Sequence, residues 1–297
     1  MEPVQWVAPA HRVAFGRALA SSVTASAAHF CVLTAGVELL GLNPLVANAL
    51  AAAIGALTNF ALNRVVAYRA RHGSVVRQGG RYALCSLTNL AWVTLLMHVG
   101  TTVLGLPYQL AWLGSAMATM TLFSYPAHRV FIFSAGTQRP AGHELPAWGA
   151  RVLRTLGTVG GLGLVPRAPG TAGTLAALPV IWLLRDQPAW LQATFAGAVI
   201  GSGIVVADAL GRHWGTDDDQ RIVLDEVAGM LVAMLAVPVT WVTLLVGFVL
   251  FRAADMAKPW PAGVFDRRKD GLGCILDDVA AGAWVLVAMH VGIWAIG

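Results

Sequence analysis

Acidic side chains in the second half of this sequence stand at the ends of apolar stretches. Five of them form three groups along the chain: Asp225 with Glu226, then Asp255, then Asp277 with Asp278. A charge at the edge of an apolar helix is unfavourable, so such residues usually mark a functional site. Carboxylate oxygens are hard ligands that suit Mg²⁺. The pattern predicts a magnesium site that polarises a phosphoryl oxygen and activates water.

Basic and glycine-rich segments near these acids supply groups that bind an anion. Lys258 and Arg252 would offset the charge of a bound phosphate. The glycine-rich segment 161–173 leads into an apolar stretch, and backbone N–H groups at a helix start bind anions. Close helix packing is the alternative explanation of these glycines. Asp217 and Asp219 are interpreted as solvated loop charges.

The composition requires lipid around most of the chain. Of its 297 residues, 57% are hydrophobic and 12% are charged, whereas soluble proteins carry about 25% charge. The net charge of +5 does not indicate nucleic acid, because arginines of a membrane protein mark its cytoplasmic loops. Three cysteines form no CxxC pair and lie in or beside apolar runs, which indicates packing thiols. No cleavable signal peptide is evident.

Four apolar stretches of the first half are long enough to cross a bilayer, which takes about 20 residues. They cover, approximately, residues 18–40, 44–66, 82–106 and 109–133. Arginines precede the first stretch, fill the loop between the second and third, and follow the fourth, whereas the other two loops contain no Lys or Arg. The positive-inside rule therefore places the N-terminus and both basic loops in the cytoplasm.

A short motif ends both the second and the fourth of these stretches. The segment 59–65 (Asn-Phe-Ala-Leu-Asn-Arg-Val) is echoed 65 residues later by 124–130 (Ser-Tyr-Pro-Ala-His-Arg-Val), and Tyr68 and Phe133 follow the two copies. The echo indicates two helical hairpins repeated in one orientation. Interfacial anchoring by each arginine is the simpler explanation.

A change in acidic content separates the two halves, since 12 of the 15 acidic residues follow residue 150. We predict a first domain at 1–135, a linker rich in Pro, Gly and small residues at 136–150, and a second domain at 151–297. Residues 151–160 are expected to form an interfacial helix. Shorter apolar stretches follow, some of them tilted or re-entrant, at about 172–184, 189–209, 222–237, 239–255 and 279–296.

Three polar clusters interrupt the apolar stretches of the second half, at about 161–174, 217–229 and 251–278. Continuing the alternation of spans from the first half places all three at the cytoplasmic face and the C-terminus in the periplasm. Separate clusters that converge on one face predict a single active site.

The second half resembles the phosphatidylglycerophosphatase A family over about 155–297. The matching residues are Gly163-Leu164-x-Pro166-x-x-Pro169-Gly170-Thr171-x-Gly173-Thr174-Leu175, Asp218 with Ile222-Val223-x-Asp225-Glu226-x-x-Gly229, Phe251-Arg252-x-x-Asp255-x-x-Lys258-Pro259-x-Pro261, and Asp277-Asp278-x-x-Ala281-Gly282. Thr174 stands where the family usually has Ser. The resemblance implies Mg²⁺-dependent hydrolysis of phosphatidylglycerophosphate to phosphatidylglycerol and phosphate in glycerophospholipid synthesis.

The residues and the resemblance together define a candidate site. The catalytic set is Asp225, Glu226, Asp255, Lys258, Asp277 and Asp278, of which the five acids are the expected Mg²⁺ ligands. The substrate-binding set is Gly163, Pro169, Gly170, Thr171, Gly173, Thr174, Asp218 and Arg252. No Cys, His or Ser nucleophile has an evident partner in the sequence, which favours metal-activated water over a covalent intermediate.

The first half resembles the GtrA-like family over about 13–135, through Asn59-Phe60-x-x-Asn63-Arg64 and the echo at 125–133. That family comprises small four-helix membrane proteins linked to translocation of lipid-linked sugars or to cell-surface polysaccharide synthesis. His128 stands where a Gln or Asn is usual.

We therefore expect an all-α polytopic protein of the bacterial inner membrane, with a four-helix GtrA-like domain and a helical phosphatase domain of about five short spans. Its partners would be phosphatidylglycerophosphate and membrane lipid, not nucleic acid, and self-association is left open. One rival is a cation-coupled transporter or flippase of lipid or lipid-linked sugar that does no hydrolysis. A CDP-alcohol phosphotransferase is disfavoured, because the sequence lacks a D-x-x-D-G-x-x-A-R run.

Overall fold

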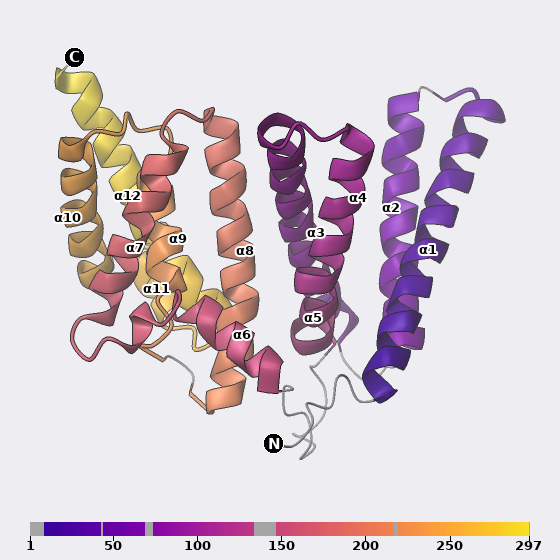
Figure 1. The fold of residues 1–297 in the computed structure, drawn as a ribbon, viewed down its shortest axis with the longest axis horizontal. Coiled ribbons are helices and arrows are strands. Elements are labelled where there is room, and N and C mark those ends of the chain that lie inside the picture. Colours follow the sequence, from indigo (N-terminus) through magenta and orange to yellow (C-terminus); the bar gives the residue numbers. More distant parts are fainter. Residues whose placement is uncertain (1–8, 43, 69–73, 134–146, 217–218, 297) are drawn as a thin grey trace. The chain divides into compact units, whose positions relative to one another are not determined.

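The computed structural model describes residues 9–42, 44–68, 74–133, 147–216 and 219–296. Throughout this described part every regular element is a helix (Figure 1). Five helices within it are long and apolar enough to cross a membrane: Gly16–Glu38, Leu50–Ala67, Val75–Val103, Ala189–Trp214 and Gly271–Ala295. The chain is an all-α, multi-pass membrane protein. Most of the predicted linker at 136–150 lies outside the described residues.

Contacts divide the chain into two compact units. The first consists of Met1–Ala83 with Tyr125–Gln138, and the second of Leu84–Ser124 with Arg139–Gly297. Helix α3 (Val75–His98) therefore contributes to both units.

The remaining described helices of the first unit are α1 (Pro9–Glu38), α2 (Pro44–Leu62), the π-helical turn η1 (Asn63–Ala67), the short α5 (Tyr125–Ala127) and the π-helical turn η4 (His128–Ile132). Small side chains let α1 and α2 pack closely, because a Cβ added at Gly36 would lie 3.0 Å from the Cβ of Ala47. The two π-helical turns begin at residues 63 and 128, which are 65 residues apart. Both copies of the sequence motif thus have the same local structure.

The second unit continues α3 into the turn η2 (Val99–Val103), and its later helices surround the short α9. Its other elements, in chain order, are α4 (Tyr108–Thr119), η3 (Met120–Ser124), α6 (Ala147–Gly157), η5 (Leu162–Leu164), α7 (Pro169–Leu184), α8 (Ala189–Trp214), α9 (Leu224–Ala233), α10 (Trp241–Ala257), α11 (Ala262–Asp266) and α12 (Gly271–Ile296). Helix α6 begins four residues before the interfacial helix predicted at 151–160, and its Val152 and Leu156 are exposed.

Glycines bring α9 and α12 into close contact. A Cβ added at Gly282 would collide with the backbone of Gly229, and one added at Gly229 would lie 2.6 Å from the carbonyl oxygen of Asp278. Phe251 of α10 is fully buried against the same crossing. This close approach places the acidic first turn of α9 beside the acids of α12.

The predicted apolar stretch at 222–237 does not form one spanning helix. Helix α9 contains 10 residues and ends at Ala233, which is too short to cross a hydrocarbon core. Proline disfavours helical backbone at the residue before it, and Pro238 follows closely. Ala236 also takes a left-handed φ of 56°.

The predicted start of the last span at 279 is wrong. Helix α12 begins at Gly271, because the carboxylate of Asp270 accepts a hydrogen bond of 2.9 Å from the N–H of Gly273 and so caps the helix. The acids at 277–278 therefore lie within the helix, about two turns from its start, rather than in a loop before it.

Candidate functional site

A polar cavity of about 320 Å³ lies in the second unit among the ends of its helices. It is lined by Ala168, Pro169, Gly170, Asp219, Gln220, Ile222, Asp225, Glu226, Arg252, Asp255, Lys258, Asp266, Arg268, Cys274, Asp277 and Asp278. These residues come from all three polar clusters of the sequence. Seven of them are acids and three are basic, so the cavity carries an excess of negative charge that favours a bound cation.

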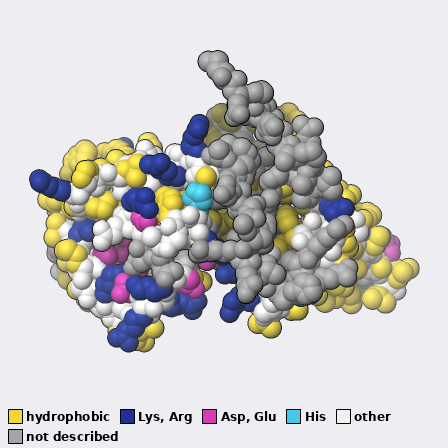
Figure 2. Space-filling model, turned by 90° about the horizontal axis from the view of Figure 1, so that it is seen from below, with side chains coloured by type: hydrophobic (Ala, Val, Ile, Leu, Met, Phe, Trp, Pro, Cys, Tyr) yellow, Lys and Arg dark blue, Asp and Glu magenta, His cyan; other side chains and the backbone are white. Residues whose placement is uncertain are grey.

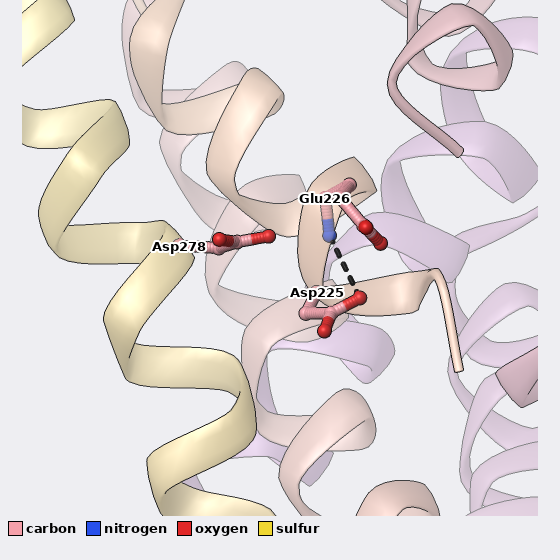
Figure 3. Close-up of side chains that lie close together, drawn as sticks. All are labelled: Asp225, Glu226 and Asp278. Carbon is pink, nitrogen blue, oxygen red and sulfur yellow. Dashed lines mark hydrogen bonds between the residues drawn. The ribbon is translucent and has the colours of Figure 1, made fainter. Parts of the chain in front are cut away.

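Three of the acids form a carboxylate triad. Asp225 and Glu226 belong to the first turn of α9, and Asp278 projects from α12 toward them (Figure 3). One oxygen of each lies within 4.8 Å of the others. Asp278 is only 4% exposed. Oxygen Oε2 of Glu226 is buried and has no hydrogen-bond partner among the described residues. A bound cation would stabilise buried carboxylates that face one another.

Local structure fixes the position of this triad. The N–H of Glu226 donates a hydrogen bond of 3.0 Å to Oδ1 of Asp225, and acids are favourable in the first turn of a helix. At the start of α7, Gly170 has no Cβ, and an added one would collide with Oε1 of Glu226 and lie 3.1 Å from a guanidinium nitrogen of Arg252. Gly170 is therefore required for the close approach of α7 to the site.

Lys258 and Arg252 bring positive charge to the cavity, each already paired with an acid. The Lys258 ammonium donates to Asp266 and, over 2.7 Å, to Oδ2 of Asp277. Burial lowers the pKa of Lys258, but the hydrogen bonds to both carboxylates outweigh it and raise that pKa above its usual value. Arg252 donates to Asp255 over 2.5 Å.

Two cavity residues have left-handed backbone, which non-glycine residues adopt at a cost in free energy. Ala168 precedes α7 with φ 54°, and Lys258 follows α10 with φ 45°. Glycine or asparagine is usual at such a helix end, so a lysine there is consistent with a role for its side chain.

Charged side chains of both signs gather on the face of the second unit that carries its cytoplasm-side loops in the predicted topology (Figure 2). Asp219 pairs with Arg221 over 2.5 Å, and the hydrogen bonds from Arg221 lower the pKa of Asp219. Arg268 pairs with Asp270 over 2.9 Å. These acids thus already have basic partners, unlike the triad.

The structure brings most of the sequence-predicted site residues to the cavity. The five predicted metal ligands, together with Lys258, Arg252, Pro169 and Gly170, line it. Asp218 lies outside the described residues.

Four predicted substrate-binding residues are not brought to the cavity wall: Gly163, Thr171, Gly173 and Thr174. A Cβ at Gly163 would collide with the Arg221 carbonyl, and one at Gly173 would lie 2.7 Å from Val223. The hydroxyl of Thr174 is buried and donates 2.9 Å to the carbonyl of Gly170. Gly163, Gly173 and Thr174 thus lie at close packing contacts outside the cavity wall, and a Cβ added at Gly173 would also lie 3.4 Å from Oε2 of Glu226.

Sequence reasoning missed several lining residues. Asp266 accepts a hydrogen bond from Lys258. It reaches the cavity because the short helix α11, which ends at Asp266, turns the chain back toward Lys258. Cys274, read as a packing thiol, lies one turn before Asp278 on α12. The shared face of Cys274 and Asp278 follows from a helix that begins after the N-cap Asp270.

Fold and site define a helical membrane protein whose second unit holds a strongly acidic cavity. Residues 155–293 match the family PgpA, phosphatidylglycerophosphatase A, and residues 19–133 match the GtrA/DPMS transmembrane domain. No solved structure matches the chain significantly.

Three relatives align with the second half. Phosphatidylglycerophosphatase A of Escherichia coli (strain K12) is 39% identical over 124 residues, which cover 41% of this chain and 72% of the relative. A protein of Bacteroides thetaiotaomicron named putative phosphatidylinositol-3-phosphatase is 38% identical over 151 residues, which cover 48% of this chain and 94% of the relative. Phosphatidylglycerophosphatase A of Haemophilus influenzae is 35% identical over 85 residues, which cover 28% of this chain and 52% of the relative. The chain belongs to the phosphatidylglycerophosphatase A family, carries a GtrA-like domain before it, and is a phosphatase.

Proposed function

We propose that this chain hydrolyses the phosphomonoester of phosphatidylglycerophosphate to phosphatidylglycerol and inorganic phosphate, using Mg²⁺, at the cytoplasmic face of the bacterial inner membrane. The observation that carries the proposal is the carboxylate triad, with a buried Glu226 oxygen that has no partner among the described residues. Two relatives of the second half are named for this activity.

The triad fits a magnesium ion by its chemistry. All three side chains offer carboxylate oxygens, which are the ligands that Mg²⁺ prefers. At Mg–O distances of about 2.1 Å, two ligand oxygens are at most ~4.2 Å apart. The triad oxygens lie within 4.8 Å of one another, so they are close to the separation at which Asp225, Glu226 and Asp278 would hold one ion together. Bound there, Mg²⁺ would polarise a phosphoryl oxygen and lower the pKa of a coordinated water.

The chain's own residues would bind the phosphate and balance its charge. Lys258 stays protonated because of its two carboxylate partners, and Arg252 lies beside the start of α7. Both would attract the phosphoryl oxygens as negative charge shifts during hydrolysis. In the described part of the chain, Cys274 lines the cavity but no Ser, Thr or His does. Direct attack by water is the mechanism that the proposed ion favours.

The cytoplasmic orientation is supported by the arginine pattern of the first half, because basic loops stay inside. A site at the helix ends would let the headgroup of a lipid enter while its acyl chains remain in the bilayer. Met256 and Trp260, on either side of Lys258, are 73% and 76% exposed, which suits contact with lipid.

A second candidate substrate is phosphatidylinositol 3-phosphate. The relative named for that activity is covered over 94% of its length. Both candidates are lipid phosphomonoesters, so the same triad chemistry would serve either one.

A substrate panel tests the proposal. Phosphate release by the purified full chain would be measured with phosphatidylglycerophosphate, phosphatidylinositol 3-phosphate and phosphatidic acid in matched micelles containing Mg²⁺. We expect the highest kcat/KM with phosphatidylglycerophosphate. A preference for the inositol lipid would transfer the assignment to that substrate. Lipid movement across a bilayer without phosphate release from any of the three would support the transporter alternative instead.

A further inference from the structure

Cys274 stands at the edge of the carboxylate triad, where the proposed magnesium chemistry has no use for it. Its Sγ lies 3.4 Å from Oδ2 of Asp225, and its side chain lines the same cavity. Cys274 and Asp278 are four residues apart on α12 and so share one face of that helix. Mg²⁺ selects oxygen ligands, whereas thiolates select soft cations such as Zn²⁺ and its heavier relative Cd²⁺.

The separation of this thiol from the carboxylate fits two ligands of a single soft ion. With Zn–S of about 2.3 Å and Zn–O of about 2.1 Å at a tetrahedral angle, sulfur and oxygen are ~3.6 Å apart. The observed 3.4 Å is close to that value. Zinc sites in proteins are usually four-coordinate, and the triad plus one thiolate supplies four ligand atoms.

The triad calls for a cation independently of the cysteine. Oxygen Oε2 of Glu226 is buried with no hydrogen-bond partner among the described residues. Asp278 is 4% exposed, points toward α9 (Figure 3), and takes part in none of the ion pairs of the described residues. A buried carboxylate without a basic partner is strongly unfavourable unless a cation binds it.

We propose that this site also binds thiophilic divalent cations, Zn²⁺ and Cd²⁺, with Cys274 as a fourth ligand beside the carboxylate triad. The thiol loses its proton to solvent as the metal–sulfur bond forms. The consequence for turnover rests on the proposed function: a soft cation in the triad excludes Mg²⁺ and inhibits the phosphatase. Cys274 thus determines which metals the site accepts.

The test uses the purified, metal-free full chain and Cd²⁺, whose bonds to thiolates absorb in the ultraviolet. The chain has three cysteines, of which Cys31 is exposed and Cys85 is buried. The variant C31S/C85S keeps Cys274 alone and should retain one cadmium–thiolate band per chain. The matched variant C274S keeps the other two cysteines and should lose the band. The affinity of C274S for Cd²⁺, relative to its affinity for Mg²⁺, should be at least about tenfold lower than in the wild type.

A third variant, Asp278→Asn, links the thiol to the triad, and its Cd²⁺ affinity should fall as well. A full band in C274S, no band in C31S/C85S, or unchanged Cd²⁺ affinity in D278N would each overturn the inference. Should C274S fail to fold, the C31S/C85S variant still decides. The absorption does not depend on turnover. A chain that binds Cd²⁺ through Cys274 but releases no phosphate would therefore refute the proposed function and leave this inference standing.

Discussion

The two units of this chain place polar side chains among apolar helices in opposite ways. In the first unit, donors meet acceptors. The amide nitrogen of Asn63 donates 2.7 Å to Asn59, that of Asn59 donates 3.0 Å to Tyr82, and Arg64 donates 2.7 Å to the buried Gln78. Oδ1 of Asn63 is buried without a hydrogen-bond partner among the described residues, but it carries no formal charge. Such a network stabilises a fold, because buried polar groups are favourable when they are hydrogen-bonded.

Aromatic rings complete the polar network of the first unit. Tyr68 stacks on Phe133 with ring centroids 4.9 Å apart, and His128 contacts both rings at 6.1 Å. Tyr68 follows the first copy of the repeated motif, His128 belongs to the second copy and Phe133 follows it, so this cluster packs the ends of the two helical hairpins against each other.

In the second unit, acceptors instead face acceptors. The carboxylate triad has an unpartnered oxygen at Glu226 among the described residues, and cavity acids outnumber basic groups. The comparison shows that helix-end polarity alone does not mark a site. An uncompensated set of buried like charges is a stronger sign, because a bound cation makes it favourable.

The largest expected effect comes from neutralising the triad. D225N, E226Q and D278N should each lower turnover about 10²-fold or more, as when an electrostatic catalytic element is removed. Their melting temperatures in detergent should stay equal or rise, because a neutral amide is easier to bury than a carboxylate. Wild-type phosphate release from all three variants would exclude the triad from catalysis.

Lys258 comes next, because it bridges Asp266 and Asp277. K258M should lower turnover at least about tenfold and also lower the melting temperature, since Asp277 would lose its basic partner. K258R is the matched control that keeps the charge, and it should recover part of the turnover and part of the melting temperature. Equal melting and turnover in K258M and wild type would show that this lysine neither holds Asp277 nor serves the substrate.

A substitution in the first unit should affect stability alone. Gln78 is 1% exposed and accepts a hydrogen bond from Arg64, so Q78A should destabilise the fold by about 1 kcal/mol or more. Phosphate release per folded molecule should not change. Reduced turnover at unchanged stability would instead indicate that the first unit takes part in the reaction.

The smallest expected effect is that of a cavity acid that already has a partner. D219N should change turnover by less than about threefold, since Arg221 balances the charge of Asp219. Because that pairing lowers the pKa of Asp219, its contribution to stability is present above the usual Asp pKa of about 4. It is lost as the pH falls through the lowered value. The difference in melting temperature between wild type and D219N should therefore disappear in acid. A loss of turnover in D219N as large as that expected for the triad variants would contradict the distinction between paired and unpaired acids.

The sequence was sufficient to predict the helical membrane fold and most lining residues of the cavity, because apolar length and acids at helix ends are local signals. It did not predict how α9 and α12 are bounded. The cap at Asp270 and the helix end before Pro238 depend on single side chains, whereas the apolar pattern places the edge of the last span after the charges at 277–278.

Tertiary contacts account for the remaining misses. Thr174 turns its hydroxyl back to Gly170, while Asp266 and Cys274 join the site through contacts with residues 8 and 49 positions away. Spacing along the chain does not reveal which of several nearby polar groups will face a cavity. That choice depends on how the helices pack.

The most direct test of the central claim is phosphate release from phosphatidylglycerophosphate by the purified full chain over a titration of free Mg²⁺, after exhaustive removal of metal with EDTA. We expect no turnover without added metal and saturable recovery with Mg²⁺, and D278N should need far more Mg²⁺ or fail to recover. Undiminished turnover in EDTA, or wild-type Mg²⁺ dependence in D278N, would contradict a metal-dependent phosphatase built on this triad.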